Sequence, residues 1–371
     1  MKYYVISGEA SGDLHGSNLM KALQVLDDKS DFRCWGGDLM KAAGGNVVKH
    51  YRDLAFMGFT EVIKNIFTIF KNFDFCKKDI LSFNPDVIIF IDYPGFNLRM
   101  AKWAKENNFK VIYYISPQVW AWKEKRVHQI KKYVDKMLVI LPFEEGFYKK
   151  WNYPVEYVGH PLVEVVEDFL SAQKKNTEHS NAIALLPGSR KQEINKKLPI
   201  MLDVSKNFPS YHFVVAKAPG LPSDFYEPFL QPYKNVSAVE NKTYHLLSEA
   251  SAALVTSGTA TLETALFGVP EIICYKGNAI SYQIAKRLVN IKYIGLVNLI
   301  MDKLVVKELI QDDLTVENIT AELHSLLENQ EKKMQIASDY AALRSLLSKG
   351  GHASTNTANS IWNYIRTSPA Q

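Results

Sequence analysis

The chain has 371 residues, a length typical of two domains and at most three. Hydrophobic residues make up 47% and charged residues 22%, so it can bury a sizeable core, and a mainly disordered state is excluded. The net charge of +5 suits an anionic ligand or membrane surface but is too diffuse to indicate a nucleic-acid partner. The three cysteines are far apart and form no CxxC pair, so they indicate neither a disulfide scaffold nor a zinc site.

The N-terminal segment MKYYVISGEASGD predicts a buried strand that runs into a glycine turn. It is too short, and becomes polar too soon, to be a signal peptide. No segment reaches the ~18 apolar residues of a membrane-spanning helix. Together with the cysteine usage, this predicts a cytoplasmic protein that is able to touch a membrane from that side.

Short apolar runs alternate with longer amphipathic stretches through the first half of the chain, beginning with a helix predicted at Gly12–Leu26. The apolar runs predict strands at Tyr3–Ile6, Phe32–Trp35, Val87–Ile91, Val111–Ile115, Met137–Ile140 and Val155–Val158. Strands that are apolar throughout are expected where both faces of a parallel sheet are covered. We therefore expect a doubly wound α/β domain over residues 1–170.

Residues 171–180 are polar and aperiodic, which predicts an interdomain linker. The strand–helix rhythm then restarts and predicts a second α/β domain over residues 181–345. Its strands are expected at Ala182–Leu186, Phe213–Ala216, Val236–Val239, Ala252–Val255 and Ile272–Cys274. Residues 346–371 predict a final helix. One arrangement open to this helix is to pack back on the first domain.

The predicted fold class is therefore α/β, with two Rossmann-like doubly wound domains facing a cleft. Ligands of such sheets bind at the carboxyl ends of the strands. The loops that directly follow strands are the places where functional side chains are expected.

The loop after the first strand, SGEASGDLHG, turns at two glycines and opens a helix whose N-terminus can face a ligand. It is not a GxGxxG fingerprint, so a dinucleotide cofactor is not expected. Glu9 is a candidate catalytic residue, and the candidate substrate contacts are Ser11, Asp13 and His15. The alternative for Ser11 and Asp13 is that they only cap the helix.

Asp92 directly follows the apolar strand Val87–Ile91, in the sequence IDYPGFN. A carboxylate at this end of a parallel strand is partly desolvated, which raises its pKa toward the range of a general base. Asp92 is therefore a candidate catalytic base and Asn97 a candidate substrate contact. The alternative is a carboxylate that organises the Tyr-Pro-Gly turn.

The loop SPQVWAWKEKR follows the next predicted strand and carries two indoles two residues apart. Trp120 and Trp122 are candidates for stacking on a sugar or lining an acyl pocket, unless they are ordinary core packing. Gln118 is a candidate polar contact, and Arg126 is a candidate phosphate contact unless it belongs to a solvated helix face.

In the second domain, the loop LPGSR follows the first predicted strand. Gly188 and Ser189 offer backbone and hydroxyl donors, and Arg190 suits bidentate contact with a phosphate. No GK[ST] follows, so this is not a Walker loop.

A second glycine loop, TSGTATLE, also opens a helix, and its free N–H groups suit a diphosphate. Its candidates for diphosphate binding are Ser257, Gly258 and Thr259, with Glu263 as a candidate ribose contact. The alternative is helix capping by the threonines, with Glu263 favouring the helix dipole.

A set of motifs runs in order from residue 7 to about residue 311: SGEASGD, MGFTEV, PDVIIFIDYPGFN, YYISPQVWAWKEKR, LPFEEGFY, VGHPL, LLPGSR, TSGTATLE and YIGLVNLI. Each motif is weak by itself. Together, in this order, they resemble the lipid-A-disaccharide synthase family.

The resemblance implies a glycosyltransferase-B fold and an inverting transfer of 2,3-diacylglucosamine from UDP-2,3-diacylglucosamine to 2,3-diacylglucosamine 1-phosphate (lipid X). The products are lipid A disaccharide 1-phosphate and UDP, and neither a metal nor another cofactor is implied. The resemblance assigns the base to Asp92 and the UDP side of the site to Arg190 and Asn298. The family commonly has a second acid where this chain has Gly95, and often an aliphatic residue at the position of His15.

Two other functions remain open on the residues alone. A UDP-sugar 2-epimerase on the same fold needs no lipid-binding surface, and a non-catalytic nucleotide- or membrane-binding protein has no need of Asp92.

The segment Phe59–Phe73 carries an apolar stripe at helical three- and four-residue steps, flanked by lysines. It predicts peripheral attachment to the cytoplasmic surface of the inner membrane, with ordinary core packing as the alternative. A homodimer is a further partner that the sequence leaves open.

Overall fold

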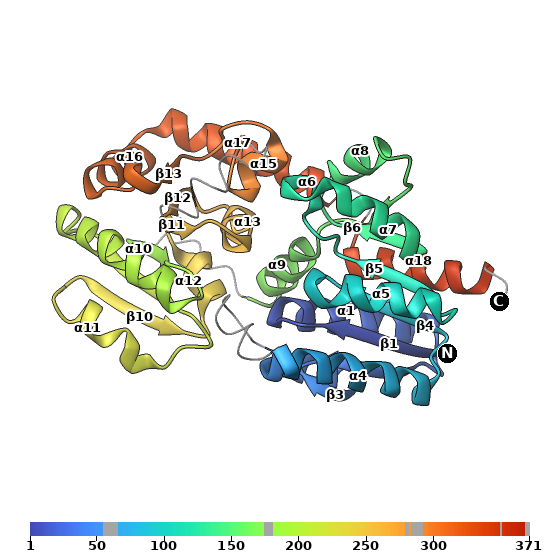
Figure 1. Ribbon diagram of the computed structural model, residues 1–371. Coiled ribbons are helices and arrows are strands. Elements are labelled where there is room, and N and C mark those ends of the chain that lie inside the picture. Colours follow the sequence, from blue (N-terminus) through green and yellow to red (C-terminus); the bar gives the residue numbers. More distant parts are fainter. Residues whose placement is uncertain (55–65, 174–180, 279–281, 283–291, 349–350, 368–371) are drawn as a thin grey trace. The chain divides into compact units, whose positions relative to one another are not determined.

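The structure is a computed structural model that describes residues 1–54, 66–173, 181–278, 282, 292–348 and 351–367. The chain divides into two compact units (Figure 1). The first unit combines Met1–Pro161 with Ser348–Gln371, and the second is Leu162–Leu347. Each unit is built around one parallel sheet with helices, so the predicted α/β class is confirmed.

The sheet of the first unit has seven strands in the order β3-β2-β1-β4-β5-β6-β7, and every neighbouring pair is parallel. The strands are β1 (Lys2–Ser7), β2 (Asp31–Gly36), β3 (Asn46–His50), β4 (Val87–Ile91), β5 (Val111–Tyr114), β6 (Lys136–Val139) and β7 (Glu156–Tyr157). The edge strand β3 was not predicted, because its half-buried residues form no continuous apolar run. The strand predicted at Val155–Val158 has only two residues.

Both faces of this sheet are buried, as its apolar strands require. Alternate residues of β1 enter different core clusters: Tyr4 and Ile6 lie in one, and Tyr3 and Val5 in the other. The same alternation in β4 and β5 fixes the register, since a one-residue slip would exchange the two faces.

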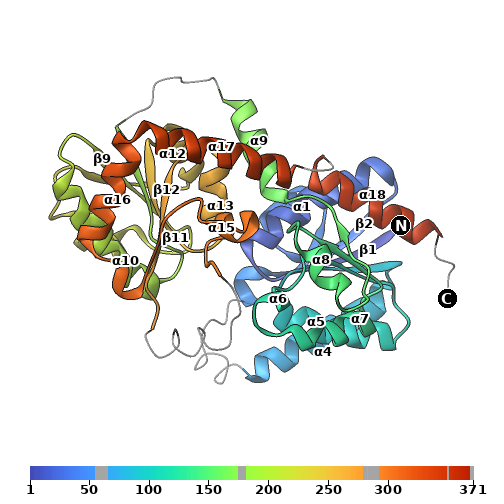
Figure 2. The ribbon, with the colours of Figure 1, turned by 90° about the horizontal axis from the view of Figure 1, so that it is seen from above.

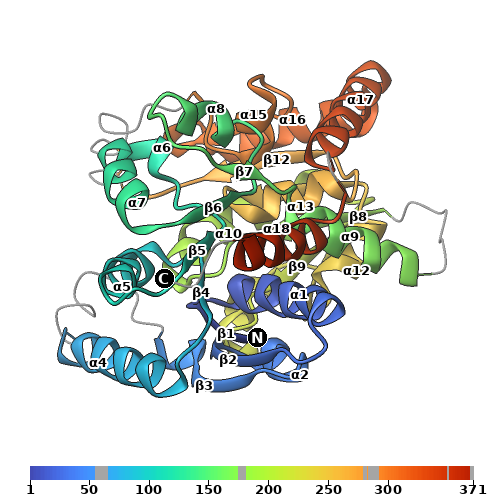
Figure 3. The same ribbon diagram turned by 90° about the vertical axis from the view of Figure 1, so that its right-hand side faces the viewer.

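Within the described residues, most helices of the first unit follow its strands in chain order, and one more comes from the end of the chain. They are α1 (Ala10–Leu26), α2 (Asp38–Ala42), α4 (Ile66–Phe83), α5 (Pro94–Glu106), α6 (Val119–Trp122), α7 (Val127–Tyr133), α8 (Glu144–Lys149) and α18 (Ala353–Thr367), with 3-10 turns at Tyr51–Leu54 and Glu124–Arg126. The last helix, α18, lies beside α1 (Figure 3). It contributes Ala358, Ile361 and Ile365 to the core cluster that also contains Tyr3 and Val5 of β1.

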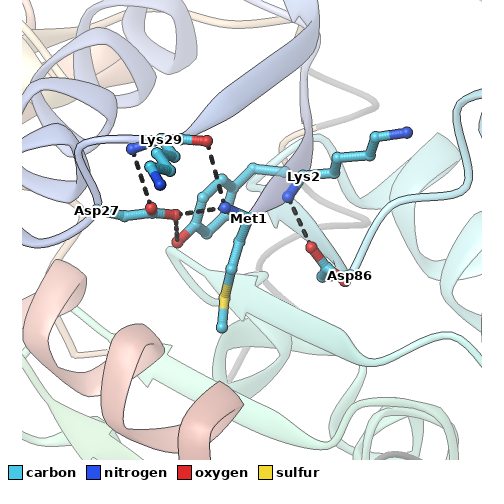
Figure 4. A network of polar contacts seen from close by, with 6 residues as sticks. Met1, Lys2, Asp27, Lys29 and Asp86 are labelled. Carbon is cyan, nitrogen blue, oxygen red and sulfur yellow. Dashed lines mark hydrogen bonds and ion pairs between the residues drawn. The ribbon is translucent and has the colours of Figure 1, made fainter.

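The start of β1 is held by polar contacts on both sides (Figure 4). The amino group of Met1 lies 2.7 Å from Asp27, whose carboxylate also accepts hydrogen bonds from the Tyr3 hydroxyl and the Lys29 amide. The amide of Lys2 donates to Asp86, just before β4. These contacts fix the start of β1 at the end of the sheet that lies opposite the loops following the strands.

The sheet of the second unit has six parallel strands in the order β10-β9-β8-β11-β12-β13. They are β8 (Ala182–Leu186), β9 (His212–Lys217), β10 (Val236–Glu240), β11 (Ala252–Thr256), β12 (Glu271–Tyr275) and β13 (Glu308–Ile310). All five predicted strands are present. The short edge strand β13 was not predicted.

The helices of the second unit are α9 (Pro161–Ala172), α10 (Lys191–Val204), α11 (Glu227–Leu230), α12 (Thr243–Glu249), α13 (Thr259–Leu266), α15 (Leu296–Met301), α16 (Val316–Glu328) and α17 (Gln330–Leu347), with 3-10 turns at Ser205–Asn207, Ser223–Phe225 and Gln311–Asp313 (Figure 2). The helical stretch predicted near the end of this unit divides in two. The side chains of Thr315 and Asn329 accept backbone N–H groups at the starts of α16 and α17, so each begins a separate helix.

The units divide nine residues earlier than the expected boundary at 170. The reason is the packing of α9, whose Phe169 ring lies edge-on to Tyr244, His245 and Phe267 of the second unit. Most of the predicted linker, residues 174–180, lies outside the described residues. None of the helices in the described ranges is both long and apolar enough to cross a membrane.

Candidate functional site

The Asp92 loop follows β4 with an unusual backbone. Asp92 and Tyr93 both have positive φ angles, 45° and 49°, which non-glycine residues adopt only at a cost in energy. The Asp92 carbonyl accepts hydrogen bonds from the Asn97 amide group at 2.7 Å and from the Tyr113 hydroxyl at 2.5 Å. These contacts hold the carboxylate at the carboxyl end of the strand.

The loops after β1 and β4 lie directly against each other. A Cβ atom at Gly8 would lie 2.4 Å from the Tyr93 ring, so only glycine fits there. Burial, with a contribution from the negative charge of Glu9, raises the pKa of Asp92 to about 6. Glu9 itself is exposed. Asp92 is therefore ionised at neutral pH with the proton affinity of an effective general base.

Asn97, a predicted substrate contact, is fully buried. Its amide group donates to the backbone carbonyls of Asp92 and, at 3.3 Å, Ile91. Asn97 therefore supports the Asp92 loop from inside the unit, and its predicted contact with substrate stays a prediction.

Asp13 is also occupied within the chain. Its carboxylate accepts backbone hydrogen bonds from Gly37 at 2.7 Å, Met40 at 3.0 Å and Leu39 at 3.1 Å, and so caps α2. The capping alternative was right in kind, but the capped helix is α2 and not Asp13's own helix. Ser11 lies exposed in the first turn of α1, so of these two residues only Ser11 is open to a ligand.

His15 is buried, and burial lowers its pKa to about 4. Burial and the proximity of His15 lower the pKa of His160 to about 3. Both rings are consequently neutral at pH 7. His15 is a buried residue of α1, and its predicted contact with substrate stays a prediction.

The loop after β5 presents its two indoles differently. Trp122 is 53% exposed, and the Lys123 ammonium lies 3.9 Å from the ring centroid, with the Arg126 guanidinium at 5.8 Å. Trp120 is half-buried and packs edge-on against Phe143, which favours the core-packing alternative for that residue.

Gln118 is exposed in the same loop, which is entered through Ile115 at a φ of 65°. A positive φ is rare for a β-branched residue, so the chain is strained where β5 ends, next to the strained Asp92 loop after β4. The two adjacent strands thus both end in constrained loops that carry candidate residues.

Glu144 is a buried carboxyl group that the sequence reasoning missed. It accepts the Leu141 amide at 2.9 Å, and burial raises its pKa to about 8. Nearby, the hydroxyls of Ser116 and Tyr148 lie 2.6 Å apart. The motif LPFEEGFY contains Glu144, but nothing in it distinguishes the buried glutamate from exposed Glu145.

The first loop of the second unit keeps its candidates open to solvent. Gly188 has a φ of 119°, which favours glycine, while Ser189 and Arg190 are exposed. The Arg190 side chain is 62% exposed and lies 3.6 Å from Glu193. Since an exposed ion pair of this length is weak, the guanidinium is free to exchange Glu193 for an anion.

The second glycine loop precedes α13. Gly258 has a φ of 148° and is exposed together with Thr259, the first residue of the helix. The first N–H groups of a helix have no partner within it and carry partial positive charge. Ser257 differs, because its hydroxyl donates to the Ile294 carbonyl at 2.8 Å and so ties this loop to the start of α15.

Glu263 lies on the second turn of α13 and is partly buried. The Tyr244 hydroxyl donates to its Oε1 at 2.8 Å, and burial raises its pKa. One carboxyl oxygen therefore has a protein partner, and the other is the one suited to a ribose hydroxyl.

Asn298 is fully buried and its amide is satisfied within the chain. Its Nδ2 donates to the Val306 carbonyl and to Glu308, and its Oδ1 accepts the amides of Val305 and Val306. Glu308 also accepts the amides at the start of α15. Asn298 thus positions the loop that Ser257 holds, and its predicted place on the UDP side of the site stays a prediction.

The stripe predicted as a membrane anchor is described only from residue 66 onward, and residues 59–65 lie outside the described residues. On α4, Phe70 is 60% exposed and Phe75 is 43% exposed. Phe73, however, stacks on Phe96 with ring centroids 4.4 Å apart. Phe73 thus belongs to the core, which corrects its assignment to the exposed stripe.

The fold is shared with solved glycosyltransferases and sugar-nucleotide epimerases. The UDP-GlcNAc 2-epimerase from Neisseria meningitidis, bound to UDP-GlcNAc, matches with a TM-score of 0.68 and 14% identity over 98% of this chain and all of that one. The calicheamicin glycosyltransferase CalG4 matches with a TM-score of 0.62 and 16% identity over 99% of each chain. At these identities the likeness concerns the fold alone, which is the glycosyltransferase-B fold.

The sequence comparison is more specific. A family model described as lipid-A-disaccharide synthetase matches residues 3–361. A lipid-A-disaccharide synthase of Coxiella burnetii (strain CbuG_Q212) is 40% identical over 370 residues, 97% of this chain and 98% of the relative. One of Trichlorobacter lovleyi is 38% identical over 357 residues, 94% and 93% of the two chains.

The chain belongs to the lipid-A-disaccharide synthase family. It is therefore an enzyme, a glycosyltransferase of lipid A biosynthesis, as the motif set predicted. The epimerase and non-catalytic alternatives are set aside, because the relatives that share its sequence over nearly its whole length are synthases.

Proposed function

We propose that the enzyme transfers 2,3-diacylglucosamine from UDP to the 6-hydroxyl of 2,3-diacylglucosamine 1-phosphate, with Asp92 as general base. The observation that carries this assignment is the constrained, partly buried carboxylate at the end of β4. Its pKa is raised to about 6 by burial and by the negative charge of Glu9. Such a group is ionised at pH 7 and still accepts a proton readily in the transition state.

In the reaction, Asp92 removes the proton of the acceptor hydroxyl as its oxygen forms a bond to the anomeric carbon. The bond from that carbon to the UDP oxygen breaks, and UDP leaves with the bonding pair. Attack on the face opposite UDP inverts the anomeric configuration. The base has to be close to the acceptor, so the first unit is assigned the acceptor side.

The second unit is assigned UDP. Arg190, with the backbone donors of Gly188 and Ser189, suits the negative charge that develops on the leaving diphosphate. The N-terminus of α13 at Gly258 and Thr259 supplies further N–H groups, which also carry partial positive charge toward the diphosphate. Glu263 is assigned the ribose, through the carboxyl oxygen that Tyr244 leaves unused.

The acceptor contacts are assigned to exposed residues of the first unit. Ser11 and Gln118 provide polar groups in loops after β1 and β5. Trp122 offers an exposed ring, and Lys123 and Arg126 offer cations beside it. This combination suits a sugar phosphate that carries acyl chains.

Release of UDP from UDP-2,3-diacylglucosamine tests the reaction. We expect UDP only when lipid X is added, in a one-to-one ratio with the disaccharide phosphate, both followed by mass spectrometry. UDP released at the same rate without acceptor would indicate hydrolysis. Conversion of the donor without UDP release would indicate an epimerase.

We also propose that the enzyme attaches reversibly to the cytoplasmic face of the inner membrane through α4. Phe70 and Phe75 expose large apolar side chains on this helix, and Lys71 and Lys78 are exposed beside them. Apolar area buried in a bilayer contributes about 25 cal/mol per Å², and lysines attract anionic headgroups, which together suffice for reversible attachment.

The double variant Phe70→Ser, Phe75→Ser tests this attachment by co-sedimentation with vesicles containing anionic lipid. We expect it to remain in the supernatant with an unchanged thermal transition. Phe73→Ser is the matched control, because this ring stacks on Phe96 and its loss should lower the melting temperature instead. Vesicle binding by the double variant equal to that of the unaltered enzyme would rule out these side chains as the anchor.

A further inference from the structure

Lys197 is a buried charged side chain in the second unit that the assigned reaction does not use. It lies on α10, its side chain is only 2% exposed, and its ammonium donates a hydrogen bond to the Thr256 hydroxyl. Burying an ammonium is unfavourable unless it is well paired, and burial lowers the pKa of Lys197 accordingly. A lysine in this position is therefore poorly explained by fold stability.

The ammonium lies where three neighbouring strands end. Thr256 is the last residue of β11, and a Cβ atom at Gly188, in the loop after β8, would lie 3.5 Å from Lys197 Nζ. Cys274 lies near the end of β12. Burial raises the pKa of its thiol, and the nearby positive charge of Lys197 partly opposes that rise. Lys197 thus lies directly behind the two loops assigned to the diphosphate.

The positive charge of Lys197 is only partly balanced by protein groups. Glu193, one turn earlier on α10, is the nearby acid that favours the charged form. Glu193 is also shared with Arg190 at 3.6 Å, and within the described ranges of the chain no carboxylate oxygen forms an ion pair with Lys197. Excess positive charge therefore remains behind the loops, in surroundings where little water screens it.

We propose that Lys197 is a positioning residue of the diphosphate site. It joins the end of β11 to the loop after β8, and it places a fixed positive charge behind the backbone donors of both loops. A nucleoside diphosphate is the ligand class that gains from this arrangement, because its charge is concentrated where these donors point. The inference rests on the proposed assignment of UDP to the second unit.

The variant Lys197→Met tests the inference, with Lys196→Met as matched control on an exposed neighbour of the same helix. Affinity for UDP is measured by calorimetry and affinity for uridine by ligand-observed NMR. We expect Lys197→Met to bind UDP about tenfold more weakly and uridine unchanged, since the lost charge acts on phosphate. The control should bind both as the unaltered enzyme does.

Two results would overturn the inference while leaving the UDP site in place: unchanged UDP affinity in Lys197→Met, or equal losses for UDP and uridine, which indicate a purely structural role. Failure of the unaltered enzyme to bind UDP would overturn the proposed function, and the inference with it. If Lys197→Met does not fold, Lys197→Gln keeps a hydrogen-bond donor and removes the charge. The same selective loss in Lys197→Gln supports the inference, and unchanged UDP affinity in it overturns the inference.

Discussion

The loop after β4 in the first unit and the loop after β8 in the second both follow inner strands of parallel sheets, but they differ in charge, exposure and backbone. Asp92 is partly buried on a left-handed backbone beside another acid, Glu9. Arg190 is exposed next to a glycine with positive φ, with a buried lysine behind the loop. One strand end thus raises proton affinity and the other attracts anions.

Under the proposed assignments, the same type of sheet supports both halves of the transfer reaction. Each sheet supplies only the position, the carboxyl end of a central strand. The residue types in the loop then decide whether the local field favours protonation of an acid or binding of a phosphate. Variants that exchange or weaken these fields are therefore the most direct tests of the two roles.

The largest effect is expected for Asp92→Asn. The variant keeps the size of the side chain but removes the base, so turnover should fall by roughly 10²–10⁴-fold while UDP affinity stays unchanged. Steady-state kinetics and calorimetry on the same preparation measure both quantities. Turnover near that of the unaltered enzyme would remove Asp92 from the role.

A loss of stability is expected for Asn298→Ala. The change leaves the Val305 and Val306 amides without their acceptor, and unpaired buried groups cost about 1–3 kcal/mol each. The free energy of unfolding in denaturant should fall by roughly 2–6 kcal/mol. Asn195→Ala, an exposed position on α10, is the control. Unchanged stability together with weakened UDP binding would instead support Asn298 as a direct ligand contact.

A smaller effect, confined to the nucleotide, is expected for Arg190→Ala. Loss of one charge-assisted contact should weaken UDP binding by about tenfold to a hundredfold and leave the KM for lipid X nearly unchanged. The exposed neighbour Lys191→Ala provides the comparison. An equal rise in KM for donor and acceptor would contradict the separation of roles between the units.

The smallest effect is expected for Glu9→Gln, in the pH profile of kcat/KM. If Asp92 is the base as proposed, activity is present above its pKa of about 6 and decreases as the pH falls below it. Removing the negative charge of Glu9 lowers that pKa, so the acidic limb should move to lower pH. Glu106→Gln, at the far end of α5, should leave the limb in place; an unmoved limb in Glu9→Gln would exclude electrostatic coupling.

The sequence predicted the central strands of both sheets because each is a continuous apolar run between polar loops. It missed β3 and β13, whose short edge segments bury only part of their residues and leave no such pattern. The sequence also placed the unit boundary within α9, because the pattern of an amphipathic helix does not indicate on which sheet the helix packs.

The sequence indicated where a side chain lies when its own loop decides the position, and it missed contacts between residues that are distant in the chain. Asp92 directly follows β4, and Arg190 lies in the short loop between β8 and α10, which fixes their place. Asp13 binds amides 24 to 27 residues away, a contact that no local pattern predicts. Lys197 did leave a signal: it stands three residues after buried Ile194 and four before buried Met201, so helical periodicity puts it on the apolar face of α10.

The packing of α18 on α1 has a consequence for synthesis of the chain on the ribosome. The core of the first unit lacks Ala358, Ile361 and Ile365 until the whole second unit has been made. We therefore expect the second unit, which is continuous in sequence, to complete its folding first, with the first unit left exposed to chaperones until the final helix emerges. A premature stop codon before residue 353 would then release a chain whose damage lies at its beginning, in the unit that carries Asp92.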